Sequence, residues 1–408
     1  MKIAFAGASN RGLHMYADNI AKQYSNHATM VGVYDTNIKR SQFWSKRLSI
    51  PVYEDFKTML VQSGADTVIV TSVDGSHHEY VIAAMEAGCD VICEKPLTTD
   101  AEKARQVLAA EKATGRKLIV TFNARYTPYS TKIKELLASG IIGKIYSAHY
   151  EHLLDCDMDV LAHGVSYFRR WNRYMQQSGG LLVHKSTHHF DLLNWWLNDA
   201  PKTVSAFGKL RRYGAAGPFR GKNCRSCEHA KKCEFYYDIT KNQFEMDFYV
   251  AAEDVDGYYK DGCVFREDID IYDTMSINVE YNQGALLTYS LNAHAPYEGW
   301  RLAVNGEKGR LEAFMPYSGQ QSEVNAHQIK VFDFDNNVTV YNLPIVREEH
   351  GGGDRRILDA LFLGAEEDPL GHRAGSGAGI DSLIIGVAAN MSIAEGRSIA
   401  VADLGCNP

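Results

Sequence analysis

Short apolar runs alternate with helix-like segments over residues 2–123. These runs contain few polar residues and read, in order, KIAFAGA, TMVGVYD, ADTVIVTS, DVICEKP and KLIVTFN. Near-continuous apolar strands separated by helices are typical of a parallel sheet that is buried on both faces. Gly88 and Gly115 stand where two of the intervening helices should end. With right-handed crossovers, this pattern predicts a doubly wound α/β domain that binds its ligand at the carboxyl ends of the strands.

The pattern changes after about Asn123. The segment STKIKELLASGIIG predicts a helix, and KIYSAHYEH predicts the strand that follows it. Three later runs have the alternation and the turn residues of antiparallel hairpins: TMSINVEYNQGALLTYSLNAH, WRLAVNGEKGRLEAF and HQIKVFDFDNNVTVYNLP. Residues 354–364 and 377–395 predict closing helices. We therefore predict a Rossmann domain over residues 1–123 and, over 124–408, an α+β domain with a large, mostly antiparallel open sheet.

The composition is that of a globular enzyme. A chain of 408 residues fits two domains at about 150 residues each. The formal charge of −7 gives no reason to expect a nucleic acid or an anionic membrane as partner. No apolar run approaches the roughly 18 residues of a membrane-spanning helix. The first strand begins at Lys2, without a signal-peptide pattern, so we expect a cytoplasmic protein.

The first strand runs into the turn Gly7-Ala8-Ser9-Asn10-Arg11-Gly12. Gly7 permits a tight turn, Gly12 permits close packing of the helix on the strand, and the amides of the helix start, at Asn10 and Arg11, can face a pyrophosphate. Ser9 stands where a dinucleotide turn usually has its second glycine, and its hydroxyl can donate to a phosphate. An ordinary strand–helix turn is the alternative.

A carboxylate follows the second strand. Asp35 lies 23 residues after Gly12, close to the spacing of about 20 residues expected for the acid that binds the ribose hydroxyls. Such a carboxylate repels a 2′-phosphate, which favours NAD over NADP, although Arg40 stands nearby.

Glu94-Lys95-Pro96 closes the fourth strand of the first domain. Pro96 restricts Lys95 to an extended conformation, so the ammonium should project from the carboxyl edge of the sheet, where a nicotinamide would lie. A solvated surface lysine is the alternative.

The segment VTSVDGSHHEYVIAAMEAGCDVICEKPL resembles the Gfo/Idh/MocA oxidoreductases, the family of glucose–fructose oxidoreductase and inositol 2-dehydrogenase. Thr71, His77 and Glu94 match a Thr-Pro-type strand end, the histidine that opens the next helix, and the Glu-Lys-Pro motif, while Ser72 replaces the usual proline. The resemblance implies that these three residues and Asn123 lie at the cofactor. It also implies that Lys95 contacts the substrate hydroxyl and the nicotinamide ribose, and that Arg125 and Tyr126 line the substrate side of that boundary.

A second constellation lies in GGLLVHKSTHHFDLLNWWL. The resemblance places His188 at the catalytic histidine, and His184 falls at the end of a glycine-led strand where many family members have an aspartate. Oxidation of an alcohol needs a base at the hydroxyl and a cation near the developing alkoxide, so we expect His188 to act as acid–base group with Lys185 or His184 in support. Metal binding by the two histidines, or simple packing, are the alternatives. Asp191 is expected to serve as a hydrogen-bonding residue, and Trp195 and Trp196 are expected in the core.

Two loops are further candidates for substrate contact. They read HAPYEGWR, from His294 to Arg301, and EHGGGDRR, from Glu349 to Arg356. A triple glycine is costly unless the backbone turns sharply or approaches another group closely. An ordinary loop role is the alternative.

The segment CRSCEHAKKC brings three cysteines together. Reduced cysteines that pack a surface loop are the favoured interpretation. A structural zinc site, held by Cys224, Cys227 and Cys233 with His229 or Cys263 as fourth ligand, is the alternative.

Together these features predict an NAD-dependent dehydrogenase that acts on a secondary hydroxyl of a sugar, glycoside or cyclitol. The resemblance implies a homodimer or homotetramer. Two other functions stay open: a hydrolase or lyase that retains NAD and oxidises its sugar only transiently, and a sensor that binds sugar or NAD without turnover.

Overall fold

The computed structural model describes residues 1–156, 163–364 and 367–406. Its first sheet is parallel, with strand order β2-β1-β3-β4-β5. β2 lies on one side of β1 and β3 on the other, so the order in which strands are added reverses between β1 and β3. Doubly wound sheets bind their ligands at this point. The strands are β1 (Lys2–Ala6), β2 (Thr29–Tyr34), β3 (Thr67–Val70), β4 (Asp90–Cys93) and β5 (Leu118–Val120).

The helices that connect these strands begin and end where the sequence provides caps. Asp55 and Asp100 accept hydrogen bonds from the first-turn amides of α3 and α5, and Gly115, at φ +64°, ends α5. The first connection starts as a π-helix. The elements are η1 (Gly12–Ala17), α1 (Asp18–Gln23), α2 (Ile38–Leu48), α3 (Phe56–Gln62), α4 (His77–Glu86) and α5 (Ala101–Thr114).

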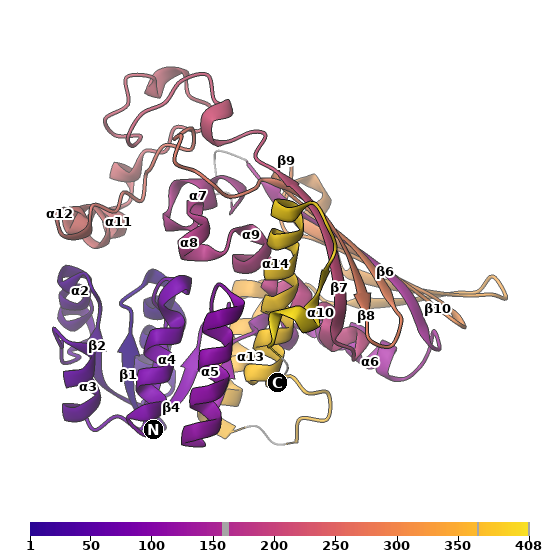
Figure 1. Ribbon diagram of the computed structural model, residues 1–408, viewed down its shortest axis with the longest axis horizontal. Helices are drawn as coiled ribbons and strands as arrows, with labels where there is room; N and C mark the ends of the chain where they lie inside the picture. The colour runs from indigo at the N-terminus through magenta and orange to yellow at the C-terminus, as the bar shows by residue number, and fades with distance from the viewer. Residues whose placement is uncertain (157–162, 365–366, 407–408) are drawn as a thin grey trace.

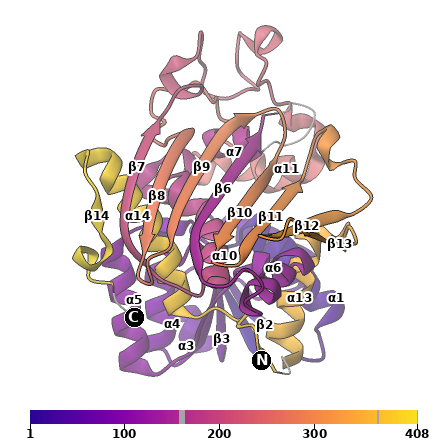
Figure 2. The ribbon, with the colours of Figure 1, turned by 90° about the vertical axis from the view of Figure 1, so that its right-hand side faces the viewer.

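The second sheet has nine strands in the order β13-β12-β11-β10-β6-β9-β8-β7-β14. Its central pair, β6 and β9, is parallel, and its other pairs are antiparallel. The predicted fold class is therefore confirmed (Figure 2). The strands are β6 (Ile145–Asp155), β7 (Pro201–Lys209), β8 (Thr274–Tyr281), β9 (Leu286–Ala295), β10 (Gly299–Gly306), β11 (Gly309–Pro316), β12 (His327–Asp333), β13 (Val338–Leu343) and β14 (Ile399–Ala400).

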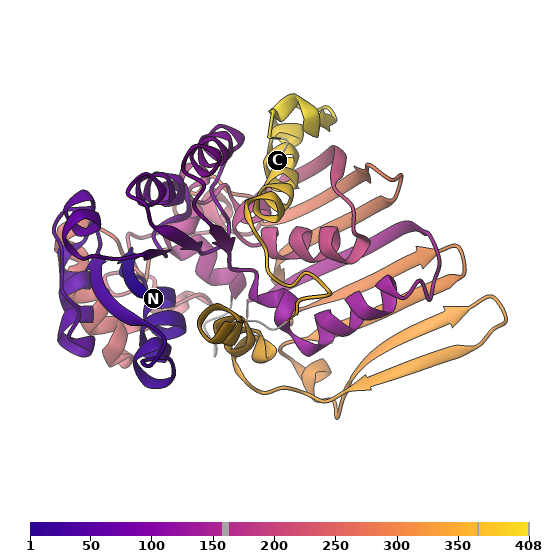
Figure 3. The same cartoon turned by 90° about the horizontal axis from the view of Figure 1, so that it is seen from below.

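Three helices cover the face of this sheet that turns toward the first domain (Figures 1 and 3). They are α6 (Pro128–Ala138), α10 (Thr187–Leu197) and α14 (Ser376–Glu395). Along β8, residues alternate strictly between exposed and buried, so the opposite face of the sheet is uncovered. Helix α14 has a mean hydropathy of 1.4, long and apolar enough to cross a membrane, but most of it is buried inside the protein.

Short helices at the top of the first domain carry the candidate site. The predicted glycine-led strand before His184 is instead a helix, α9 (Leu181–His184). Gly179 and Gly180 both have positive φ and turn the chain sharply, and α9 packs so closely on α14 that a Cβ on Gly386 would lie 2.2 Å from the Leu182 carbonyl oxygen. The neighbouring elements are η2 (Asp74–Ser76), η3 (Asn123–Tyr126), α7 (His163–Arg169), η4 (Trp171–Arg173) and α8 (Met175–Ser178).

An insertion over residues 210–273, between β7 and β8, reaches back to the first domain (Figure 1). The amide nitrogen of the Asn37 side chain donates to the carbonyl of Ala252 at 2.9 Å. Phe43 packs edge-on against Phe244 and Phe248. The insertion is therefore docked on α2 through its elements η5 (Gly214–Ala216), η6 (Ala230–Lys232), η7 (Ile239–Lys241), α11 (Gln243–Phe248), η8 (Val250–Ala252) and α12 (Glu253–Asp256).

A late segment also joins the first domain. After β13, the chain returns to the first domain through η10 (Glu349–Gly352), α13 (Gly353–Asp359) and η11 (Ala360–Gly364). Two other short helices are η9 (Gln320–Ser322), between β11 and β12, and η12 (Val401–Leu404), after β14. Ile357, Leu358 and Phe362 are buried in the cluster formed by β1, η1 and α1. The Tyr24 hydroxyl donates to Asp359 at 2.7 Å. The folded unit around the first sheet thus includes α13.

Candidate active site

The glycines of the first turn allow two strand ends to meet. Gly7 has φ +100°, and a Cβ there would lie 2.5 Å from the backbone nitrogen of Ser72. A Cβ on Gly12 would lie 2.6 Å from Oγ1 of Thr71. The Ser9 hydroxyl oxygen accepts a hydrogen bond from the Gly12 amide at 2.9 Å, so this side chain caps the helix start. Substituting either glycine would push the turn off β3.

The turn and the acid after β2 provide the groups that a dinucleotide needs. Asp35 accepts hydrogen bonds from the Ala8 and Asn37 amides, both at 2.7 Å, and burial raises the pKa of this carboxyl. The amides of Asn10 and Arg11 lie in the first helical turn, where amides have no intrahelical acceptor. The Asn10 side-chain oxygen is buried and has no partner among the described residues. These donors and this acceptor fit a pyrophosphate and a ribose.

Three residues predicted at the cofactor belong to one polar network with Asp354 of α13. Arg11 lies 3.0 Å from Glu94 and 2.9 Å from Asp354, and the Asn123 amide donates to the same Asp354. Burial raises the pKa of Asp354, but His350 and Arg11 outweigh burial and hold it well below its usual range. The glycine-rich loop therefore supplies a carboxylate to this network. Its Gly353 would place a Cβ 2.5 Å from the Asn123 carbonyl oxygen, which accounts for glycine there.

Thr71 and His77 bind backbone groups. The Thr71 hydroxyl donates to the Gly7 carbonyl at 2.7 Å. The two ring nitrogens of His77 lie 2.8 Å from the carbonyl oxygen of Pro96 and 3.1 Å from that of Ser72. The structure thus places both residues as supports of the turns around the predicted cofactor site.

Lys95 is partly buried and its ammonium reaches the second domain. Its Nζ donates to the backbone carbonyl of His184 at 2.8 Å, and the Lys95–Pro96 peptide bond is cis. Burial lowers the pKa of Lys95 to about 8, against the opposing charges of Asp74 and Glu94. A solvated surface lysine is therefore excluded.

His184 is paired with a carboxylate from the first domain. Its Nδ1 lies 2.6 Å from Oδ2 of Asp74, and both side chains are buried. Burial lowers the pKa of His184 well below its usual range, and the charges of Lys95 and Arg170 act in the same direction. Asp74 is not predicted from the sequence; its only signal there is an acidic residue in the turn after β3, three positions before His77.

Lys185 and His188 lie in the same cluster and are partly buried. The Lys185 Nζ is 3.6 Å from Glu298, whose other oxygen is 2.8 Å from Nδ1 of His163. Burial lowers the pKa of Lys185, but Tyr167 and Glu298 outweigh it and raise this pKa. His188 has a buried Nδ1 without a partner in the described ranges, and burial, with Lys95 and Lys185, lowers its pKa well below normal. The loop His294 to Arg301 supplies Glu298 to this cluster.

The guanidinium of Arg125 binds groups inside the protein and does not face a ligand site. Its guanidinium forms a two-pronged pair with Asp191, at 2.8 and 2.6 Å, and donates to the Gly371 carbonyl. Asp191 thus has the expected hydrogen-bonding role. Tyr126 packs beside His372, with 5.3 Å between ring centres. Trp195 and Trp196 are buried, as expected.

The cysteine segment folds around a small cavity. Cys224, Cys227, Cys233 and Cys263 line this cavity, whereas His229 packs on the ring of Phe219 at 4.7 Å. Among the residues that the structure describes, no three His, Cys, Asp or Glu side chains are arranged to hold a metal ion. Within the described residues, the four cysteines that line this cavity form no disulfide bond. The zinc site stays a prediction.

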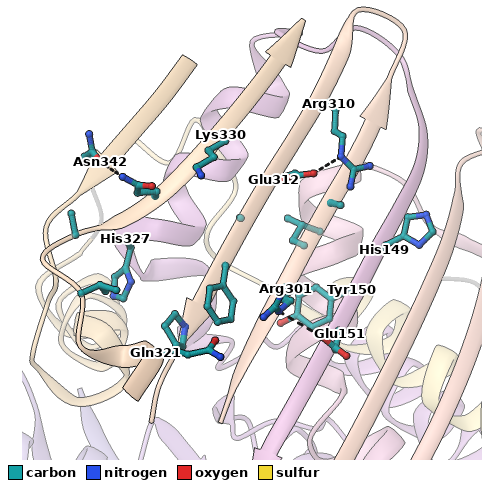
Figure 4. Close-up of a pocket in the computed structure, with 18 of the residues that line it drawn as sticks. His149, Tyr150, Glu151, Arg301, Arg310, Glu312, Gln321, His327, Lys330 and Asn342 are labelled. Atoms are coloured by element: carbon teal, nitrogen blue, oxygen red, sulfur yellow. Dashed lines mark hydrogen bonds and ion pairs between the residues drawn. The ribbon is translucent and has the colours of Figure 1, made fainter. Parts of the chain in front are cut away.

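A separate hollow lies on the uncovered face of the nine-stranded sheet (Figure 4). It has a volume of about 1000 Å³ and is lined by polar side chains of β6, β10, β11 and β12, including His149, Glu151, Arg301, Arg310, Glu312 and Lys330. Arg310 and Glu312 form an ion pair across it at 2.7 Å. None of the predicted catalytic residues lines this hollow, so it is separate from the site between the domains.

Comparison with known proteins gives matches along almost the whole chain. Residues 1–122 match the family described as "Oxidoreductase family, NAD-binding Rossmann fold", and residues 134–401 match "Oxidoreductase family, C-terminal alpha/beta domain". The chain is 36% identical over 433 residues to YteT of Bacillus subtilis, whose name marks it only as an oxidoreductase, and the match covers 98% of both chains.

Two further matches concern sugar derivatives. The chain is 27% identical over 226 residues to D-glucoside 3-dehydrogenase of Escherichia coli, which covers 54% of this chain and 61% of that protein. The WlbA dehydrogenase from Bordetella pertussis, solved with NADH and UDP-GlcNAcA, has the same fold, with a TM-score of 0.67, 17% identity and coverage of 98% of each chain.

Proposed function

The chain belongs to the Gfo/Idh/MocA oxidoreductase family, and we propose that it is an NAD-dependent dehydrogenase acting on a secondary hydroxyl of a sugar, glycoside or cyclitol. One observation carries this proposal. The ammonium of Lys95, from the first domain, donates to the backbone of His184, and the charges of Lys95 and Lys185 act on His188. A cation and two neutral imidazoles therefore meet at the carboxyl edge of the first sheet.

This arrangement supplies what alcohol oxidation requires of the protein. Bound NAD would supply the hydride acceptor at C4 of its nicotinamide ring. Lys95 would donate a hydrogen bond to the hydroxyl oxygen of the substrate and stabilise the negative charge that develops there. A neutral imidazole would accept the hydroxyl proton. His184 is buried and Lys95 and His188 are partly buried, so each electrostatic contact is screened by water less than it would be at an exposed surface.

The choice of NAD over NADP rests on the surroundings of Asp35. Its carboxylate stands beside the first turn and would repel a 2′-phosphate. Arg40, the nearby cation noted in the sequence, is paired with Asp256 of the insertion at 2.7 Å. The ion pair reduces the attraction of this side chain for an added phosphate.

The substrate class rests on the relatives. One of them is named for a D-glucoside and another was solved with a nucleotide sugar. Several polar and charged groups of both domains surround the site, which suits a ligand with many hydroxyls.

We also propose that the chain is a cytoplasmic homodimer or homotetramer. The uncovered face of the large sheet is the proposed contact. Phe207 on β7 and Leu286 on β9 are 78% and 57% exposed there, and exposed apolar side chains of this kind favour association.

The decisive experiment is a screen of free sugars, inositols and aryl glycosides with NAD, in which NADH and released aglycone are followed together. NADH formation with one group of polyols is the expected result. Release of the aglycone without net NADH would identify the hydrolase or lyase instead. Binding of NAD and of a sugar with no turnover of either kind would identify a sensor.

A further inference from the structure

Asp74 and His184 form a buried pair that joins the two domains. Asp74 opens η2, directly after the carboxyl end of β3, and His184 ends α9. Their side-chain exposures are 4% and 11%, and 2.6 Å separates Oδ2 from Nδ1. The separation is that of a strong hydrogen bond between nitrogen and oxygen, with one proton between the two groups.

The backbone around Asp74 is built for this contact. A Cβ on Gly75 would lie 3.1 Å from the Gln176 carbonyl oxygen and 3.2 Å from that of Gln177. A larger residue at position 75 would therefore force η2 away from α8 and lengthen the pair. The rings of Tyr167 and Trp171 pack edge-on against the imidazole, with centres 5.3 and 5.4 Å away. The ring of His184 is thus fixed on three sides.

The second nitrogen of His184 remains available. Nε2 makes no hydrogen bond within the described ranges of the chain, and it is not among the fully buried atoms that lack a partner. Burial raises the pKa of Asp74, and the charge of Lys95 opposes this shift. The ionised carboxylate favours the tautomer of His184 with hydrogen on Nδ1, which leaves a lone pair on Nε2. The Lys95 ammonium lies close by, because its Nζ donates to the backbone carbonyl of this same residue.

We propose that His184, held by Asp74, is the group that takes the hydroxyl proton of the substrate. This inference rests on the proposed function. In the step, the O–H proton would move to Nε2 of His184 and the C–O bond would become a carbonyl. The C–H hydrogen would leave with its electron pair as hydride, for which bound NAD would be the acceptor. Asp74 is a positioning residue that also stabilises the imidazolium formed.

The other candidates in the cluster lack this arrangement. His188 has a buried Nδ1 with no partner in the part of the chain that is described, so no acid orients its ring. Lys95, with its pKa near 8, is mostly charged at neutral pH and suits the stabilisation of an alkoxide. Burial is the main cause that lowers the pKa of His184, and four neighbouring groups lower it further. They are Lys95, just after β4, Arg170, just after α7, Lys185, just after α9, and His77 on α4. The imidazole is therefore neutral at neutral pH, which is the form whose Nε2 can accept a proton.

The test compares Asp74→Asn and His184→Gln with the wild type in three measurements. Both variants should lower kcat by at least ~100-fold, as expected for loss of acid–base catalysis, while the Kd for NAD is unchanged. In ligand-free protein labelled with ¹⁵N-histidine, NMR should show His184 with hydrogen on Nδ1, and Asp74→Asn should alter this tautomer. Asp191→Asn is the matched control because it weakens a different buried ion pair, between Asp191 on α10 and Arg125. This variant should lower the melting temperature and leave the tautomer of His184 unchanged.

Two results overturn the inference while the proposed function stands. They are an Asp74→Asn variant that keeps the wild-type kcat and pH profile, and a wild-type His184 with its hydrogen on Nε2. A wild type that binds NAD but oxidises no sugar, glycoside or cyclitol overturns the proposed function, and this inference with it.

Discussion

The Nη2 atom of Arg40 lies 2.7 Å from Oδ2 of Asp256, and this ion pair joins α2 to the insertion. Asp256→Ala would free the guanidinium next to the carboxylate of Asp35. Since a hydrogen bond to a charged group contributes about 1.5–3 kcal/mol, we expect the affinity for NADP to rise at least ~10-fold. Calorimetric titration with NAD and NADP measures this.

Asp254→Ala is the control for that substitution. Asp254 is on α12, as Asp256 is, and its substitution removes an exposed ion pair with Lys39. The affinity for both dinucleotides should stay the same. An unchanged affinity for NADP in Asp256→Ala would show that Arg40 does not face the ribose.

Lys95 should set the alkaline limit of activity. Burial lowers its pKa to about 8, so the ammonium loses its proton as the pH rises through this value. Because the charged form stabilises the alkoxide, kcat/KM should fall above pH 8. Lys95→Ala should lower turnover at neutral pH by at least ~100-fold and abolish this alkaline limb, whereas His184→Gln should cost a similar factor and keep it. A wild-type profile that is flat across this range would contradict the assignment.

The pair of Arg125 and Asp191 should matter for stability. Their side chains are 7% and 1% exposed, so removing one partner leaves an uncompensated buried charge. Asp191→Ala should lower the free energy of unfolding by about 3–5 kcal/mol. Denaturant titration measures the loss. A decrease close to zero would mean that water reaches Arg125 in the folded protein.

Gly353 should tolerate no side chain. A Cβ at this position meets the Asn123 carbonyl oxygen at 2.5 Å, whereas a Cβ at Gly375 lies 3.6 Å from its nearest neighbour. Gly353→Ala should therefore cost ~1–3 kcal/mol through overpacking, and Gly375→Ala should be nearly neutral. Thermal unfolding of the two variants gives the comparison. Equal melting temperatures would show that the loop moves away from Asn123 without cost.

The uncovered sheet face should decide the oligomeric state. Phe207→Asp and Leu286→Asp place charges on this face, and light scattering should show a shift from the proposed dimer or tetramer toward the monomer. Val61→Asp alters a residue that is 82% exposed on α3 of the first domain and serves as control. A wild type that is monomeric at high concentration would end the proposal.

The periodicity of apolar residues is enough to predict both sheets, because burial on one or two faces is a local property of each strand. It does not predict that Phe244 and Phe248 of the insertion dock on Phe43, because the packing joins segments some 200 residues apart and involves few side chains. Similarly, a short apolar run such as Leu181–His184 fits a strand or a helix until its neighbours are known.

The candidate site also has residues that can be predicted from the sequence and residues whose roles depend on distant parts of the chain. Lys95, His184 and His188 stand in motifs that can be recognised, and the structure gathers them. Asp74 lies in a turn, where aspartate is common for local reasons, and its partner becomes clear only when the domains meet. Arg125 is the opposite case: its position suggests a ligand, yet Asp191 binds it.

Helix α13 also determines how this chain can be divided. The side chains of Ile357, Leu358 and Phe362 cover apolar side chains of the first domain. A truncated fragment that stops at residue 123 would expose that surface to water and should aggregate on expression. A soluble half-protein would need residues 353–364 supplied as well, either tethered to the fragment or added as a separate peptide.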